Sequence, residues 1–166
     1  MNQGILGDCW FLSAASSIAE FPGRMEKVFF NTENNMNTMG IYAVNFWTLG
    51  VPHSVIVDDY LPLVKNPYTG SYRTLFTKPG DDGSLWTAIL EKAFAKYYGN
   101  YEHIAGGQAQ MAVSTMTGSP YLKFFTKDTS ADELWEKILA ADRAKHMMNA
   151  GSPAGSDKTT DASGLV

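Results

Sequence analysis

Two segments of the chain carry apolar residues at the spacing of an amphipathic helix. The first follows Asp8, a residue type favoured at helix N-caps, and stops at Pro22. Its apolar residues lie on one side: Phe11, Leu12, Ala15 and Ile18. The second follows Ser84, which can cap it, and ends at Gly99. Its apolar stripe consists of Trp86, Leu90, Ala93 and Tyr97. We therefore expect two main helices, and a shorter helical segment at residues 24–30.

Between these helices the pattern changes to β-branched and aromatic residues. Residues 41–47 and 54–64 are each typical of a strand, and Gly50 lies in the turn between them. A shorter strand is expected at residues 72–76, within a turn-rich segment. The sequence thus predicts a hairpin or small meander that the helices cover, after a polar loop at residues 31–40.

The C-terminal third continues with further short elements. A helical segment is expected near residues 108–116, and the TGSP sequence after it indicates a boundary between two units. Beyond this boundary, residues 121–125 (YLKFF) are a candidate strand. Ser130 and Glu133 form a capping box that opens another helix.

These elements divide the chain into two predicted units, residues 1–118 and residues 119–166. The second unit ends in a stretch of small and polar residues, 150–166, with nothing apolar to pack until its last two positions. We expect a new apolar segment to start there.

Composition excludes several classes of protein. Of the 166 residues, 45% are hydrophobic and 18% are charged, which is typical of a globular domain rather than a disordered chain. A net charge of -4 without a basic cluster argues against nucleic-acid binding. No segment approaches the roughly 20 consecutive apolar residues of a membrane span. A single cysteine cannot form an intrachain disulfide or a multi-thiolate zinc site.

That cysteine, Cys9, is the main candidate for chemistry. It is expected in the first turn of the first helix. Thiols react as thiolates, and the N–H groups and dipole at a helix N-terminus stabilise the negative charge. The alternative is a small buried hydrophobe, as a cysteine next to Trp10 and Phe11 often is. Local chemistry alone leaves both interpretations open.

Three longer motifs carry a resemblance to a known family. The segment QGILGDCWFLSA (residues 3–14) resembles the cysteine box of calpains, which are papain-like cysteine proteases of the cytosol. VDDYLP (57–62) and LWTAILEKAFAKYYGNYEHIAGG (85–107) are similar to later calpain segments, in the same order. The resemblance implies a papain-like α/β (α+β) fold, with a complete first subdomain and part of a second.

The resemblance also implies roles for four residues. Cys9 corresponds to the nucleophile, and Gln3 to the side chain that donates its amide to the oxyanion hole together with the Cys9 backbone N–H. Gly107 and Trp10 correspond to substrate-binding positions, where a glycine leaves room for an extended peptide. On local grounds Gly107 is equally well explained as a turn glycine.

A cysteine protease also needs a histidine base and a side chain that orients it. We expect His53, His103 and His146 to have structural or surface roles. In calpains the histidine base lies in a later strand with a GHAY-like sequence, and the asparagine lies in a still later strand with an NPWG-like sequence. The final residues here, DASGLV, are similar to the calpain segment that leads into the histidine-bearing strand. The expected function is a calpain-like cysteine endopeptidase core that is inactive, or nearly so, as this isolated chain. The alternative is a non-catalytic calpain-like scaffold or interaction module.

Calcium is possible by the same resemblance, although the chemistry does not require a cofactor. A calcium-binding glutamate of calpains corresponds to Ser84, near Asp81 and Asp82. The two aspartates could supply oxygen ligands, but a solvated turn is the preferred interpretation, and we assign no metal ligand. The partners expected are extended protein substrates and the remainder of the protease core, in the cytoplasm, with no nucleic acid and no membrane span.

Overall fold

The computed structural model describes residues 1–30 and 37–152, which form a mixed α/β fold. The described helices are α1 (Cys9–Ala19), α2 (Trp86–Tyr98), α3 (Ala109–Thr117) and α4 (Ala131–Arg143). Short 3-10 turns are η1 (Met25–Lys27) and η2 (Glu102–Ile104). Two antiparallel pairs of strands are described: β1 (Ile41–Thr48) with β2 (Val51–Asp58), and β3 (Leu63–Lys65) with β4 (Tyr72–Thr74).

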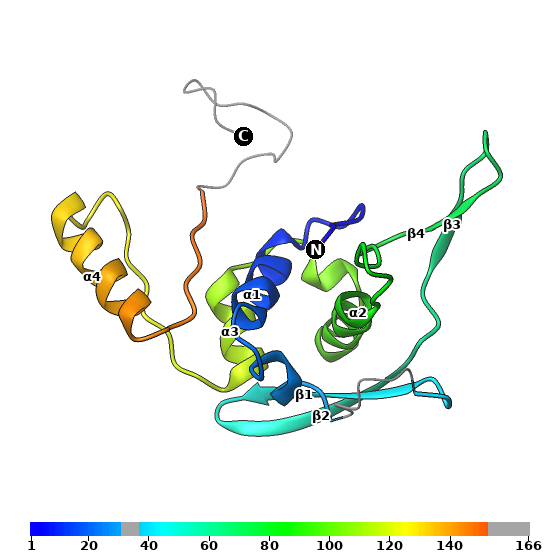
Figure 1. Cartoon of the computed structure of the whole chain (residues 1–166), viewed down its shortest axis with the longest axis horizontal. Helices are drawn as coiled ribbons and strands as arrows, with labels where there is room; N and C mark the ends of the chain where they lie inside the picture. Colours follow the sequence, from blue (N-terminus) through cyan, green and yellow to red (C-terminus); the bar gives the residue numbers. More distant parts are fainter. Residues whose placement is uncertain (31–36, 153–166) are drawn as a thin grey trace.

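Helices α1, α2 and α3 lie together over the β1–β2 hairpin (Figure 1). Helix α3 contacts both α1 and β1, and α2 contacts β2. The β3–β4 ribbon extends away from the helices on one side, and α4 stands apart on the other (Figure 1). The helical layer therefore provides the scaffold that holds the N-terminal end of α1.

An aromatic cluster forms the centre of the core. The ring of Phe94 on α2 is fully buried and lies 4.4 Å from the ring of Phe11 on α1, in a stacked arrangement. Its edge contacts are with Trp10, at 5.6 Å, and with Phe46 of β1, at 5.5 Å. Phe94 thus joins α1, α2 and the hairpin in one apolar contact region.

The β1–β2 hairpin turns in two residues, Leu49 and Gly50, because Thr48 pairs with Val51. Both turn residues have positive φ angles, 50° and 80°. Tight hairpins need this backbone conformation because it matches the twist of the strands, and glycine adopts it at little cost. The predicted turn at Gly50 is confirmed.

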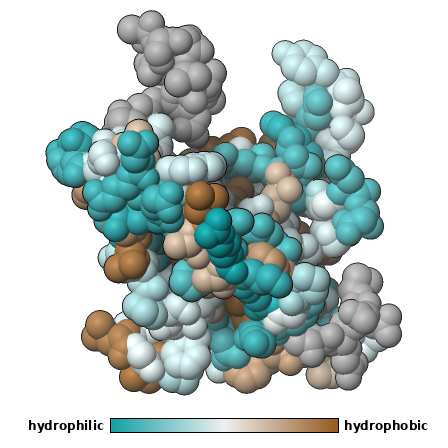
Figure 2. Space-filling view, turned by 60° about the vertical axis from the view of Figure 1, so that its left-hand side comes forward, coloured by the Kyte–Doolittle hydropathy of each residue, from teal (hydrophilic) through white to brown (hydrophobic). Residues whose placement is uncertain are grey.

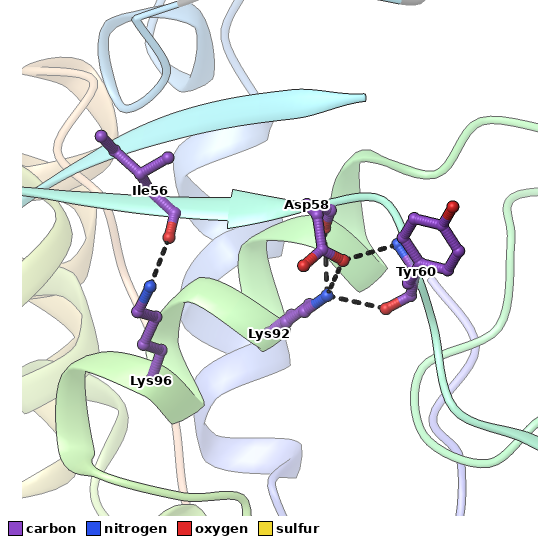
Figure 3. A network of polar contacts seen from close by, with 5 residues as sticks. All are labelled: Ile56, Asp58, Tyr60, Lys92 and Lys96. Carbon is purple, nitrogen blue, oxygen red and sulfur yellow. Dashed lines mark hydrogen bonds and ion pairs between the residues drawn. The ribbon is translucent and has the colours of Figure 1, made fainter. Parts of the chain in front are cut away.

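Two lysines of α2 attach this helix to β2 (Figure 3). Lys92 Nζ donates to the carboxylate of Asp58, at 2.5 Å, and to the backbone oxygen of Tyr60, at 2.7 Å. Lys96 Nζ donates to the backbone oxygen of Ile56, at 2.7 Å. Unpaired carbonyl groups at the edge of a sheet can pair with a strand of another chain. Lysine side chains that donate to these groups oppose such pairing.

Several element boundaries differ from the sequence prediction. Residues 121–125 are not a strand: the whole segment is exposed, and no neighbouring strand of the described residues pairs with it. The expected strand at 54–64 is divided between β2 and β3. Only one 3-10 turn forms within residues 24–30. Helix α2 begins after Leu85 and has no side-chain cap, so the prediction that Ser84 caps it was wrong.

Helix α4 begins as the sequence predicts. Ser130 Oγ accepts a hydrogen bond from the backbone N–H of Glu133, at 3.3 Å, which confirms the expected cap. No residue of α4 is buried, and Trp135 is 58% exposed. Apolar residues reach the surface in separate patches between polar ones on the face that Figure 2 shows. Among the described helices, none has both the length and the apolar character needed to cross a bilayer.

Residues 153–166 and 31–36 lie outside the described part of the chain, and with them most of the polar segments expected at 150–166 and 31–40. The division into units at residues 1–118 and 119–166 stays a prediction.

Candidate active site at the start of helix α1

Cys9 is the first residue of α1, and its side chain is exposed. The first helical turn, which contains Cys9, is closed by the backbone oxygen of Asp8, which accepts from the N–H groups of Phe11, at 2.9 Å, and Leu12, at 3.1 Å. The following residue, Trp10, is buried. The helix therefore presents the thiol to solvent at its positive end while its next residues anchor it in the core, which rules out the buried-hydrophobe interpretation.

The N-terminal segment lies along residues 75–78. The backbone N–H of Ile5 donates to Leu75 O, at 3.2 Å, and that of Lys78 donates to Asn2 O, at 2.9 Å. Gln3 is thereby held between two anchored residues. Its side-chain Nε2 donates to Leu6 O, at 2.5 Å, and to Asp8 Oδ1, at 3.4 Å.

The Gln3 amide is therefore turned inward along the loop that leads to Cys9. Its contact with Asp8 is the longer and weaker of the two, so it is the one that the amide can exchange most readily for another acceptor.

Asp8 is the N-cap residue of α1, but its side chain makes no capping hydrogen bond. The prediction that Asp8 caps the helix is therefore only partly right, because its backbone accepts the first helical hydrogen bonds but its side chain does not. The carboxyl group instead points into the protein, where it is fully buried. There it meets Glu91 of α2, which is 1% exposed. The Glu91 carboxylate accepts from the hydroxyl of Thr77, at 2.7 Å, and from its backbone N–H, at 3.0 Å.

Burial and the neighbouring Asp8 carboxyl raise the pKa of Glu91 to about 8. Burial also raises the pKa of Asp8, against the opposing effect of its hydrogen bonds with Glu91 and Gln3. The Tyr101 phenol has its pKa raised by burial and by both carboxyl groups. The pair therefore retains a proton that exposed carboxyl groups would release.

Glu91 was missed by the sequence analysis. The sequence indicates its burial only weakly. The residues one or two helical turns from Glu91, namely Thr87, Phe94 and Tyr98, are uncharged, so none of them could pair with it as on an exposed helix face. The apolar stripe through Trp86 and Leu90 does not include position 91, so a solvated glutamate fits the pattern equally well.

Trp10 and Gly107 contact each other. The indole Nε1 of Trp10 donates to Ile104 O, at 2.9 Å, and the backbone N–H of Gly106 donates to Gly7 O, at 2.8 Å. A Cβ added at Gly107 would lie 2.3 Å from the indole ring. The loop after α2 is thus attached to the loop that carries Cys9, and glycine at 107 is what permits this close approach.

Replacing Gly107 by alanine should lower the free energy of unfolding by about 1–3 kcal/mol, since the buried indole cannot move without breaking its hydrogen bond. Chemical denaturation measures this change. Gly7→Ala is the matched control, because a Cβ there meets no atom within 4 Å. Equal stabilities for the two variants would contradict the tight contact between loop and indole.

Each histidine has a place elsewhere in the fold. The ring of His53, on β2, lies 6.5 Å from the ring of Tyr97. The Nδ1 atom of His103 lies 2.8 Å from Tyr98 O at the end of α2. His146 follows α4.

A family model described as "Calpain family cysteine protease" matches residues 1–166. The chain belongs to the calpain family. "Calpain-type cysteine protease DEK1" of Zea mays is 36% identical over 173 residues, a match that covers 99% of the chain and 8% of that relative. "Calpain clp-4" of Caenorhabditis elegans is 35% identical over 119 residues, with 71% of the chain and 16% of the relative covered. "Calpain-5" of Mus musculus is 33% identical over 153 residues, with 84% and 23% covered.

The predicted relation to calpains is thereby confirmed for the chain as a whole, and the mixed α/β fold is consistent with a calpain protease core. The chain spans between 8% and 23% of the length of these calpains.

In the turn before α2, the carboxylate of Asp82 already has hydrogen-bond partners within the chain. Asp82 Oδ1 accepts from the backbone N–H of Ser84, at 3.0 Å, and the side chain and backbone of Ser84 together lower the pKa of the Asp82 carboxyl. Across residues 1–30 and 37–152, no three histidine, cysteine, aspartate or glutamate side chains gather closely enough to hold a metal ion. Calcium binding stays a prediction from the calpain resemblance, and no step below depends on it.

Proposed function

We propose that Cys9 is the nucleophile of a cysteine endopeptidase, as its place in the calpain family suggests. The observation that carries this proposal is the exposure of Cys9 at the first position of α1, on a turn fixed by backbone hydrogen bonds. A helix N-terminus stabilises a thiolate, and it also offers N–H groups to a negatively charged oxygen.

In the proposed reaction Cys9 Sγ attacks the scissile carbonyl carbon. A carbon–sulfur bond forms, and the electron pair of the carbonyl moves to its oxygen. The Cys9 backbone N–H and the Gln3 amide stabilise this oxygen, for which Gln3 gives up its 3.4 Å contact with Asp8. Collapse of the intermediate breaks the carbon–nitrogen bond and leaves a thioester on Cys9.

A histidine base must take the thiol proton and deliver it to the leaving amine. Because His53 and His103 are engaged at β2 and at the end of α2, we propose that neither is this base. We propose the same of His146, which follows α4. The isolated chain should therefore bind peptide substrates but not cleave them, because the leaving amine would receive no proton. Its partners would be extended protein segments and the remainder of the protease core, and we propose a cytoplasmic location.

Two reagents separate nucleophile activation from oxyanion stabilisation. Iodoacetamide alkylates a thiolate by displacing iodide, with no oxyanion. 4-Nitrophenyl acetate is attacked at its carbonyl, passes through an oxyanion and releases 4-nitrophenolate, which needs no acid to leave. Both reactions can be followed on the isolated chain, with Cys9→Ala as the blank because Cys9 is its only cysteine.

We expect Cys9 to be acylated faster than N-acetylcysteine at matched thiolate concentration. Gln3→Ala should slow acylation at least about 10-fold and leave alkylation within about 2-fold of the unmodified chain, since only acylation uses the donor. Acylation no faster than that of N-acetylcysteine would overturn the proposal and favour a non-catalytic scaffold or interaction module.

A further inference from the structure

The buried carboxyl groups of Asp8 and Glu91 are placed where two negative charges are unfavourable. Asp8 precedes the nucleophile, and Glu91 projects from the middle of α2. The two carboxyl groups lie close enough for each to shift the pKa of the other. The second oxygen of Asp8, Oδ2, is buried, and no backbone, amide or hydroxyl donor of the described residues reaches it.

An unsatisfied carboxylate oxygen in a protein interior is costly, and two adjacent ionised carboxylates are more so. One proton between the two groups removes both problems, because a protonated Glu91 donates to Asp8. The Thr77 donors remain with Glu91, and the Gln3 amide remains with Asp8 Oδ1.

We propose that Asp8 and Glu91 share one proton and act as a positioning pair that sets how firmly the Gln3 amide is held for the reaction at Cys9. This inference rests on the proposed function. Asp8 and the developing oxyanion compete for the same Gln3 N–H. In the singly protonated pair the Asp8 carboxylate already accepts from Glu91, so it holds the Gln3 amide less firmly than a doubly ionised pair does.

Few other groups act on the pair. The Tyr101 phenol faces it from the segment after α2 and stays neutral, because its pKa is raised. Lys78 follows Thr77 but is exposed, and Lys92, next to Glu91, is directed to Asp58. Helix α1 contains no charged residue. The ionisation of Glu91 is therefore the event that changes the charge at this place as pH rises.

The test is the ratio of acylation by 4-nitrophenyl acetate to alkylation by iodoacetamide, measured from about pH 6 to pH 9.5. Both rates depend on the same thiolate, so its titration cancels in the ratio. We expect a constant ratio at low pH and a fall of about 3- to 10-fold at high pH, because the Asp8 carboxylate holds the Gln3 amide more firmly once it no longer accepts from a protonated Glu91. Because Glu91 has its pKa raised to about 8, the fall should be centred there.

Glu91→Gln mimics the protonated side chain at every pH and should keep the ratio constant. The exposed Glu136→Gln on α4 is the matched control for loss of a carboxylate and should retain the fall. Thr77→Val is a second, independent variant: it removes a hydroxyl that favours the ionised form of Glu91, so the fall should move to higher pH.

A purely structural role for the pair would neither abolish the fall in Glu91→Gln nor move it to higher pH in Thr77→Val. A fall that persists unchanged in folded Glu91→Gln, or that moves to lower pH in Thr77→Val, would overturn the positioning role. That result leaves the nucleophile assignment intact, because the assignment depends only on the rate relative to N-acetylcysteine.

Discussion

Truncation of Phe94 to alanine should lower the free energy of unfolding by about 3–5 kcal/mol. The ring is fully buried and contacts Phe11, Trp10 and Phe46, so its removal leaves a cavity bordered by α1 and β1. The helices cannot close this space, because α2 packs against the β1–β2 hairpin and α1 packs against α3, which contacts β1. Urea denaturation followed by tryptophan fluorescence measures the change.

Phe30→Ala is the matched control, since it removes the same side chain from a position that is 57% exposed. We expect it to cost less than about 1 kcal/mol. Similar losses for Phe30→Ala and Phe94→Ala would show that Phe94 is not the centre of the core.

The stability of the chain should fall by about 2–4 kcal/mol between roughly pH 5 and pH 8, through Glu91 alone. In the unfolded chain this carboxyl titrates near its ordinary pKa of 4.5, whereas burial beside Asp8 raises its pKa in the folded chain to about 8. Between these values the folded state holds a proton that the unfolded state releases. The stabilisation is therefore fully present below pH 4.5 and is lost as pH rises towards 8. Urea midpoints measured across this range provide the test.

Glu91→Gln isolates this contribution from all other titrating groups. Glutamine cannot ionise, so the difference in stability between Glu91→Gln and the unmodified chain should grow in favour of the variant as pH rises. Glu136→Gln should show no such trend, because it is exposed. A difference between Glu91→Gln and the unmodified chain that does not vary with pH would mean that Glu91 is ionised in the folded protein.

Local patterns in the sequence were sufficient for most elements of the fold. The apolar stripe of α2, the turn at Gly50 and the cap at Ser130 each depend on residues within a few positions of one another. The prediction of a strand at 121–125 was wrong because a strand depends on residues far away in the sequence. Its residues have the right composition, but a strand forms only with a partner, and the composition of one segment says nothing about its neighbours.

For the site, the sequence by itself determined the identity of the cysteine, its place at a helix start and the family motif that includes Gln3. These follow from residue type and spacing along one stretch of chain. Only the tertiary structure decided where the Asp8 carboxyl points, because the choice between capping α1 and meeting Glu91 depends on the packing of α2, 83 residues later in the chain. Burial, the shared proton and the inward turn of Gln3 arise from that packing, and no pattern within a single segment encodes them.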